Sequence, residues 1–359
     1  MEGGQGFDTF AARGDARREQ FDLPPTGDGA ALFRDLGFVR LDLAGVERVE
    51  ILADGGGDDV ALSDLTGTGI EEVLVALGGG GGMDSLAFIG IGSAEGLTLS
   101  RTLEGGILVD GLGVRTEITG FDAAKDLFII SLGEGGDVVD ARAFSGADLI
   151  VAAGAGDDLG HLGFGDDLWS VVGTPGNDTV EGSAGRDTLD LDASIADDVI
   201  TVSGTGEAAT ATHAGSTLTL RETERVEVES AGSDDLVDGS GVTAGLRLFL
   251  EGGAGDDTLV GGARADVLAG GAGDDSLEGG GAADRFVFGA EDGDGVQDLD
   301  VVAGYSKAGG DVLQIRPAAG LFLANAVDEG MLITLLSGGD NDQVLVLGVE
   351  SLNYLAVVA

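Results

Sequence analysis

The chain of 359 residues contains no cysteine, only four prolines and only 5% aromatic residues. The absence of cysteine excludes disulfide cross-links and thiolate metal sites. No apolar run approaches the roughly 20 residues needed to span a membrane. The N-terminus lacks the basic and apolar regions of a cleaved signal peptide. We therefore expect no transmembrane segment, and any export has to use another signal.

Basic residues are also scarce, with 18 Lys and Arg against 65 Asp and Glu, which gives a formal net charge of -47. Such acidity argues against nucleic acid and anionic membrane surfaces as partners and favours multivalent cations. High charge with few aromatic residues is typical of disorder. Here the apolar residues, 43% of the chain, form short runs of Leu, Val, Ile and Ala, so the chain can build a narrow core.

Glycine is abundant, at 68 residues, and its most regular spacing lies in residues 252–287, where four nonapeptides follow one another. The first nonapeptide reads Gly-Gly-Ala-Gly-Asp-Asp-Thr-Leu-Val, and each sixth residue is aspartate while each eighth residue is apolar. The G-G-x-G-x-D-x-U-x pattern is that of calcium-binding parallel β-helix repeats. The sixth-position aspartates are Asp257, Asp266, Asp275 and Asp284.

Each nonapeptide predicts a six-residue turn followed by a three-residue strand. Glycines allow positive φ and let backbone carbonyls approach an ion, and aspartate supplies the hard oxygen that Ca²⁺ prefers. Because a coil takes two nonapeptides, the turn at position 252 is expected to pair with that at 270, and the turn at 261 with that at 279. The predicted calcium ligands are the four aspartates and the turn residues Gly252, Ala254, Gly255, Gly261, Ala263, Gly270, Ala272, Gly273, Gly279 and Gly281.

A second, less regular block of nonapeptides lies in the middle of the chain. Its turns begin near Ala153, Leu162, Gly173 and Gly182. Two extra residues, Val171 and Val172, interrupt its register. The predicted calcium ligands of this block are Asp158, Asp167, Asp178 and Asp187.

Several turns depart from the glycine frame. The fourth-position glycine is replaced by Arg264 in the second C-terminal turn and by Ala282 in the fourth, and Ala153 and Leu162 replace the first glycine in the middle block. An L-residue at a φ that requires glycine costs about 1 kcal/mol or more. We therefore expect weak calcium binding, or none, in these turns.

Weaker candidate ligands stand in isolated turns, at Asp8, Asp59 and Asp235. The first of these belongs to residues 3–11, which fit the nonapeptide at every defined position. A first repeat without an upstream partner suggests that the chain is the C-terminal part of something longer, or a short member of a family of longer proteins.

The nonapeptides resemble those of the repeats-in-toxin (RTX) proteins, also called hemolysin-type calcium-binding proteins. The closing segment, from Asp284-Arg285-Phe286-Val287-Phe288 to the apolar terminus, resembles the end of type I secretion substrates. The resemblance implies an all-β fold, a right-handed parallel β-roll or β-helix solenoid with calcium-binding turns and a C-terminal β-cap. It also implies export by a type I ABC exporter and an extracellular, secreted location, with cell-surface association as a further expectation.

Five segments follow from the pattern and the resemblance. Irregular β-solenoid repeats occupy residues 1–145, the middle calcium-binding block 146–190, and a further irregular repeat 191–245. The C-terminal calcium-binding block occupies residues 246–289, and a β-cap with the secretion signal occupies 290–359.

No motif indicates catalysis. The sequence contains neither a His-Glu-x-x-His zinc motif nor a Gly-x-Ser-x-Gly nucleophile elbow. Its two histidines, His161 and His213, are expected on the surface. The leading hypothesis is a non-enzymatic, secreted calcium-binding protein with a structural, adhesive or spacer role towards a cell-surface or matrix polymer. One alternative is the C-terminal secretion module of a larger toxin or hydrolase, and another is a solenoid enzyme acting on acidic polysaccharide.

Overall fold

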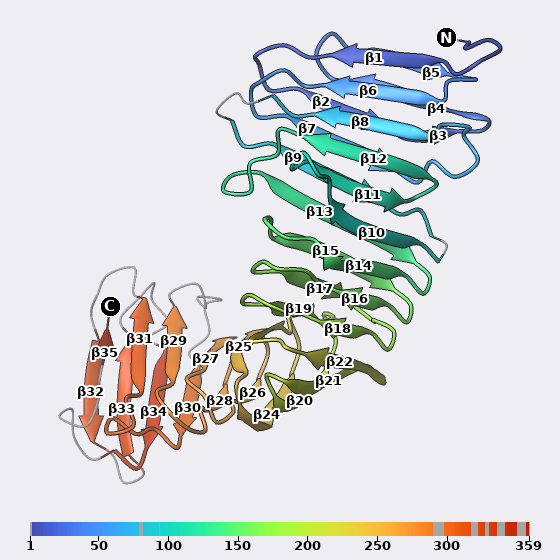
Figure 1. The fold of residues 1–359 in the computed structure, drawn as a ribbon. Helices are drawn as coiled ribbons and strands as arrows, with labels where there is room; N and C mark the ends of the chain where they lie inside the picture. The colour runs from blue at the N-terminus through green and yellow to red at the C-terminus, as the bar shows by residue number, and fades with distance from the viewer. Residues whose placement is uncertain are drawn as a thin grey trace. The chain divides into compact units, whose positions relative to one another are not determined.

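The computed structural model describes residues 2–78, 82–92, 94–289, 298–316, 322–326, 330–335, 342–349 and 357–358. These residues form strands and turns and no helix, so the described chain offers no helical membrane span (Figure 1). The chain divides into two units, Met1–Ser170 with Gly176–Asp187, and Val171–Pro175 with Thr188–Ala359. The prediction of an all-β fold with parallel strands is confirmed.

In the first unit, one sheet contains two runs of parallel strands. The first run is β1–β6–β8–β12, and the second run is β10–β14–β16–β18. The two runs are joined by an antiparallel meander of β10, β11 and β12. The strands are β1 (Thr9–Arg13), β6 (Arg48–Leu52), β8 (Glu72–Ala76), β10 (Gly96–Arg101), β11 (Ile107–Gly111), β12 (Val114–Thr119), β14 (Val138–Ala143), β16 (Leu159–His161) and β18 (Thr179–Glu181).

The opposite stack of the first unit runs β2–β7–β9–β13–β15–β17 with all pairs parallel, and β3, β4 and β5 add an antiparallel excursion. The strands are β2 (Gln20–Leu23), β3 (Pro25–Thr26), β4 (Gly29–Arg34), β5 (Val39–Leu43), β7 (Asp59–Ser63), β9 (Ser85–Ile89), β13 (Leu127–Glu134), β15 (Leu149–Ala155) and β17 (Leu168–Val172), whose last two residues belong to the second unit.

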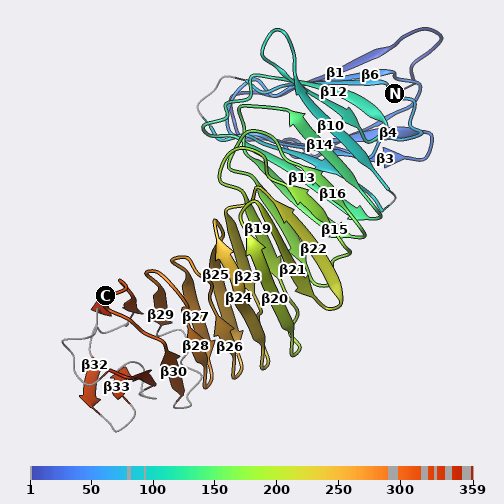
Figure 2. The ribbon, with the colours of Figure 1, turned by 60° about the horizontal axis from the view of Figure 1, so that its bottom comes forward.

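In the second unit, one stack runs β19–β23–β25–β27–β29–β31–β35, again with all pairs parallel. Strands β25, β27 and β29 lie side by side in both ribbon views (Figures 1 and 2). The strands are β19 (Thr188–Asp192), β23 (Arg225–Glu229), β25 (Arg247–Ala254), β27 (Val267–Ala272), β29 (Arg285–Gly289), β31 (Val312–Arg316) and β35 (Val357–Val358).

The facing stack of the second unit is parallel along β20–β24–β26–β28–β30–β34, with antiparallel excursions at β20–β21–β22 and β32–β33–β34. The strands are β20 (Val199–Thr205), β21 (Ala208–His213), β22 (Ser216–Arg221), β24 (Leu236–Ala244), β26 (Thr258–Val260), β28 (Ser276–Glu278), β30 (Leu299–Ala303), β32 (Phe322–Ala326), β33 (Gly330–Leu335) and β34 (Gln343–Leu347).

The core is a narrow column of inward-facing apolar side chains. Strand residues alternate between buried and half-exposed, as the two-residue period of a strand requires. All four eighth-position residues of the C-terminal block are fully buried, namely Leu259, Leu268, Leu277 and Phe286. Full burial of such a side chain contributes about 1.5–3 kcal/mol, so each coil adds a small increment to the stability.

Trp169 is the largest buried side chain and occupies the eighth position of a middle-block repeat, as expected of a core residue. Gly160 on the facing strand β16 makes room for it, because a Cβ there would lie 2.3 Å from the indole ring. The core therefore accommodates the large indole ring of Trp169 because Gly160, on the facing strand, has no side chain.

The predicted cap of residues 290–359 lies only partly within the described residues. Its described strands β30 and β31 continue the two stacks of the second unit. Of the apolar terminus, only Val357 and Val358 are described, as β35, which pairs with Leu313 and Gln314. Leu355, Ala356 and Ala359 lie outside the described residues.

Candidate calcium sites

The sixth-position aspartates form hydrogen-bonded ladders along the turns. In the C-terminal block, the Asp257 amide donates to Oδ1 of Asp275 at 2.9 Å, and the Asp266 amide donates to Oδ1 of Asp284 at 3.0 Å. The strands that follow these turns pair in the same way, β26 with β28 and β27 with β29. The predicted stacking of the turns at 252 and 270, and of those at 261 and 279, is therefore what the structure has.

The middle block forms the same ladders with a longer interval. The Asp158 amide donates to Oδ1 of Asp178, and the Asp167 amide donates to Oδ1 of Asp187, both at 3.0 Å and across 20 residues instead of 18. The two extra residues lie at the end of β17, where Val171 is buried and Val172 is exposed. The insertion lengthens a strand, so the aspartates stay in register.

One group of turns leaves the second carboxylate oxygen open. Oδ2 of Asp257 and Oδ2 of Asp158 are buried and have no hydrogen-bond partner. Burial raises the pKa of Asp257 to about 6 and that of Asp158 to about 7. A buried carboxylate oxygen without a partner is unfavourable. A hard cation is the partner that suits it.

In the C-terminal block, the first-position glycines provide the space beside the second carboxylate oxygens of Asp257 and Asp275. A Cβ at Gly252 would lie 2.2 Å from Oδ2 of Asp257, and a Cβ at Gly270 would lie 1.9 Å from Oδ2 of Asp275. Any side chain at either glycine would therefore fill the cradle next to the carboxylate. The residues of these two turns fit a calcium ion.

Backbone conformation distinguishes the same two turns. The second and fourth positions have positive φ, at +104° and +135° for Gly253 and Gly255, and +116° and +124° for Gly271 and Gly273. Glycine adopts this region without the steric cost that an L-side chain meets. The frame predicted from the sequence is thus required by the turn.

A second group of turns closes on its own aspartate. Oδ2 of Asp266 accepts a hydrogen bond from the Gly262 amide at 2.6 Å, and Oδ2 of Asp167 accepts one from the Gly163 amide at 3.2 Å. Neither Gly262 nor Arg264 has a positive φ. The backbone amide here takes the place that a cation would take.

The fourth C-terminal turn keeps the left-handed conformation despite its alanine. Gly280 and Ala282 have φ of +89° and +75°, so the Asp284 turn resembles the Asp257 turn with one strained residue. The two replacements of the fourth glycine thus differ in outcome. Alanine is held in the left-handed region, whereas at Arg264 the turn changes its path.

The weaker candidates met different outcomes. Asp8 is in a closed turn, because its Oδ2 accepts from the Gly4 amide at 2.7 Å. Asp235 is a ladder member, and its amide donates to Oδ1 of Asp257 at 2.8 Å. Asp59 does not join a ladder. Asp59 binds the Arg18 guanidinium at 2.7 Å, while the neighbouring Asp58 is buried in a ladder.

The sequence-based prediction omits further ladder members, which lie outside the two nonapeptide blocks, and all of them except Asp84 lack the complete glycine frame. Each is an aspartate two residues before a buried apolar residue, as Asp137 is before Val139, so the shorter pattern D-x-U would have identified them. They are Asp58, Asp84, Asp126, Asp137, Asp198, Asp300 and Asp311.

The expectation that both histidines lie on the surface was wrong for one of them. His213 is 1% exposed, and its Nε2 lies 3.0 Å from Oδ1 of Asp198. His161 is half-buried, with Nδ1 2.8 Å from Oε2 of Glu181. Across the described ranges, no three His, Cys, Asp or Glu side chains gather as a metal cluster. An ion in the open turns would therefore draw most ligands from backbone carbonyls.

The fold and the turns define a parallel β-solenoid with aspartate–glycine turns of the calcium-binding kind. Residues 170–194 and 251–286 match the RTX calcium-binding nonapeptide repeat, in four copies. The chain therefore contains RTX calcium-binding nonapeptide repeats, and the resemblance noted in the sequence is confirmed.

No curated protein sequence matches the chain. Among solved structures, it is similar to the extracellular lipase LipA from Serratia marcescens, with 18% identity and a TM-score of 0.26 over 68% of this chain and 44% of the lipase. The chain thus spans less than half the length of that relative.

Proposed function

We propose that this chain is a secreted calcium-binding β-roll protein that folds on binding calcium after export. In this proposal it has no catalytic activity and serves as a structural, adhesive or spacer module. The observation that carries the proposal is the open turn at Asp257, where a buried carboxylate oxygen has no partner and faces a cradle free of side chains. The RTX repeats of residues 170–194 and 251–286 support the same assignment.

The residues that would hold the ion are Asp257 and Asp275, together with carbonyl groups of the glycine turns above them. When bound, calcium would supply positive charge between stacked turns. The protein contributes the ladder, which fixes one oxygen of each aspartate on the neighbouring amide and so orients the other.

Calcium dependence of folding follows from the charge. The formal net charge of -47 opposes compaction, and burial raises the pKa of several ladder aspartates, so ionising them in the fold is costly at neutral pH. At free calcium about ten times the Kd, one site contributes about 1.4 kcal/mol. Several sites together would match the typical folding free energy of about 5–15 kcal/mol.

Far-ultraviolet circular dichroism tests the proposal. In EDTA the spectrum is expected to be that of an unfolded chain, and in millimolar calcium that of a β protein. Magnesium at equal concentration is the control, because it demands octahedral geometry and gives up its water reluctantly, so the turns should respond to it poorly. A complete β spectrum in EDTA would contradict folding on calcium.

Export by a type I ABC exporter is the second part of the proposal. Deleting residues 343–359 would remove β34, which pairs with both β30 and β33, so a loss of export could reflect a damaged cap. A shorter deletion, residues 351–359, spares β34 and, of the described strands, removes only the two-residue strand β35, which pairs with β31. Co-expression with an exporter is expected to give the whole chain in the medium and the shortened chain in the cell. Equal export of the two would place the signal elsewhere.

A further inference from the structure

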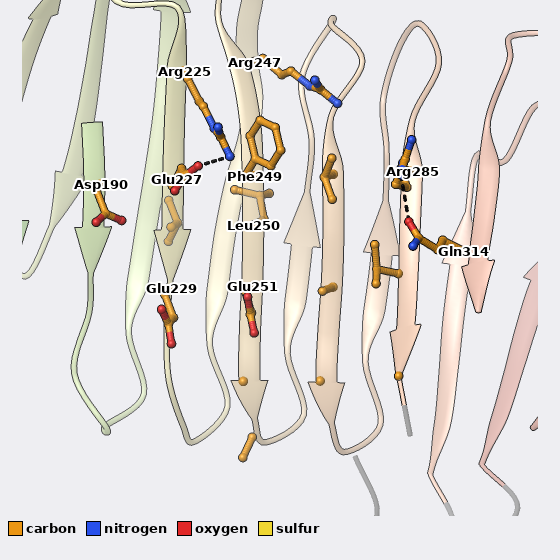
Figure 3. A pocket seen from close by; sticks show the side chains of 18 of the residues that line it. Asp190, Arg225, Glu227, Glu229, Arg247, Phe249, Leu250, Glu251, Arg285 and Gln314 are labelled. Carbon is orange, nitrogen blue, oxygen red and sulfur yellow. Dashed lines mark hydrogen bonds and ion pairs between the residues drawn. The ribbon is translucent and has the colours of Figure 1, made fainter. Parts of the chain in front are cut away.

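A groove of about 810 Å³ lies on the outer face of the second unit, and its lining extends to Gly253 and Gly271 of the calcium turns. Its lining side chains come from the parallel strands β19, β23, β25, β27, β29 and β31 (Figure 3). Pockets of about 300–1,000 Å³ are typical of ligand sites. Neither the ladders nor the calcium proposal uses the charged side chains of this groove.

Small outward residues on the middle strand create the hollow. Val267, Ala269 and Gly271 alternate outward along β27 while Leu268 is buried beneath them. In register with them stand Phe249 on one neighbouring strand and Arg285 on the other. The bottom of the groove is therefore formed by small side chains of β27, and its walls are formed by the longer side chains of Phe249 and Arg285 on the two neighbouring strands.

Arginines gather at one end of the groove. Arg225 and Arg247 are direct cross-strand neighbours, and their guanidinium carbons lie 3.6 and 4.6 Å from the ring centroid of Phe249. Arg225 is also ion-paired with Glu227. The aromatic ring holds both guanidinium groups through cation–π contacts, so they are oriented before any ligand arrives.

Two arginines of this end have no acidic partner. Within the described residues, neither Arg247 nor Arg285 forms an ion pair, and Arg285 donates from Nη1 to Oε1 of Gln314 at 2.9 Å. Both side chains are exposed. In a chain with 65 acidic and only 18 basic residues, cations left without carboxylates in one groove are available for an external anion.

The other end of the groove is acidic. Glu229 and Glu251 are cross-strand neighbours, and Figure 3 places them below the arginines along the same strands. Burial, then the charges of Glu251 and Asp192, raise the pKa of Glu229. Ionised carboxylates are acceptors only, so this end suits a ligand with hydroxyl donors.

We propose that this groove binds an acidic glycan, with the carboxylates of its uronic acid units on Arg247 and Arg285 and its hydroxyl groups on Glu229 and Glu251. A polyphosphate or a DNA backbone supplies anionic groups but no hydroxyl donors for the glutamates. An apolar ligand would find a floor of only a few methyl groups. The proposal rests on the proposed function only in that it gives the adhesive role a partner.

Isothermal titration calorimetry on the full chain in saturating calcium tests the groove. The probes are short oligogalacturonates, the same oligomers with methyl-esterified carboxyls, a neutral glucan oligomer and poly-L-glutamate. Among these probes, binding is expected only for the oligogalacturonates with free carboxyl groups. R247Q and R285Q are each expected to weaken it about tenfold, because each variant loses a charge-assisted hydrogen bond.

A charge-matched control is the double variant R13Q/R221Q, which removes two exposed arginines from β1 and β22, outside the groove. Its affinity is expected to equal that of the parent, whereas R247Q/R285Q abolishes measurable binding. Circular dichroism of each variant in calcium confirms that the fold is retained.

Three results would overturn the glycan assignment: equal binding of the methyl esters or the glucan, equal binding of poly-L-glutamate, or equal loss in the control variant. A folded, calcium-loaded protein that binds none of the probes also overturns it and leaves the proposed function intact. Failure to bind calcium would instead overturn the proposed function.

Discussion

The turns at Asp257 and Asp266 both begin Gly-Gly-Ala and lie nine residues apart, yet they hold their aspartates differently. At Asp257 the second carboxylate oxygen is buried without a partner, and at Asp266 the Gly262 amide occupies it. The first turn has positive φ at its second and fourth positions, and the second turn has it at neither. Two positions of the six-residue turn accompany the change, with Gly255 and Asp256 in one turn and Arg264 and Ala265 in the other.

The comparison shows that an aspartate at the sixth position serves two purposes. Its Oδ1 always continues the ladder, as the bonds to the Asp235 and Leu248 amides show. Its Oδ2 is available to an ion only where the amide at the second position of the turn does not donate a hydrogen bond to it. The ladder is therefore common to all these turns, and metal binding is restricted to some.

The largest difference is expected from removing aspartates in pairs. D257A/D275A should eliminate the ion between the stacked turns at Asp257 and Asp275 and destabilise the fold by about 2.7 kcal/mol at free calcium about 100 times the Kd. D158A/D167A should cost less calcium binding, because Oδ2 of Asp167 is already bonded to an amide. Calorimetric calcium titration and thermal unfolding of both variants measure this. Equal calcium losses would refute the ranking.

Acidification is expected to weaken calcium binding. With folded-state pKa values of about 6 at Asp257 and about 7 at Asp158, protons compete with the ion below those values. From about pH 8 to about pH 5 the affinity should fall about tenfold at the Asp257 turn and about a hundredfold at the Asp158 turn.

Without calcium the sign of the pH effect reverses. Both pKa values lie above the ordinary aspartate value of 3.8, so the folded state binds protons more tightly than the unfolded state. The ion-free fold therefore gains stability as the pH falls through about 7 and 6. Circular dichroism in EDTA across this range is the measurement. Because the chain is expected to be unfolded in EDTA at neutral pH, β signal should increase on acidification, and the absence of any increase would contradict the pKa shifts.

R264G tests whether the closed turn can be opened. Glycine allows the positive φ that the fourth position has at Gly255, so the variant is expected to bind one more calcium ion, worth about 1.4 kcal/mol at ten times the Kd. R264A is the matched control, since it removes the same charge without that freedom. An unchanged calcium stoichiometry in R264G would show that Arg264 is not what closes the turn.

The smallest effect is expected from A282G. Ala282 has a φ of +75°, which costs about 1–2 kcal/mol for an L-residue, while glycine adds chain entropy to the unfolded state. The net gain in stability should be below about 1 kcal/mol, with calcium stoichiometry unchanged. Thermal unfolding in saturating calcium measures it, and a loss of stability would be the contrary result.

The periodic features of the fold could be predicted from the sequence. The nine-residue spacing of Asp257, Asp266, Asp275 and Asp284 was sufficient to predict which turns stack, because a two-repeat coil admits only that pairing. The buried eighth-position residues followed from the same period. In the repeated nonapeptides, the local conformation that each residue prefers is also the one that its tertiary contacts require. The sequence pattern therefore predicts the structure of these repeats well.

The closed turns and the groove could not be predicted in the same way. Arg264 could either adopt a strained positive φ or change the backbone path of the turn. Which of these happens depends on whether the Gly262 amide can donate a hydrogen bond to Oδ2 of Asp266. The ladder at Asp58 escaped notice because its neighbour Asp59 is equally acidic, and only burial distinguishes them. The groove combines Arg247 and Arg285, which are 38 residues apart and meet through strand register alone.

The ladder also bears on how such a chain could change length. Each coil of 18 residues brings one amide donor and one carboxylate acceptor to each edge, as the bonds from Asp257 to Asp275 and from Asp266 to Asp284 show. Duplicating or deleting one coil would leave no donor or acceptor unmatched at the junction. Gain or loss of whole coils in the gene would thus change the stability per coil very little. An insertion of any other size must instead lengthen a strand, as Val171 and Val172 lengthen β17.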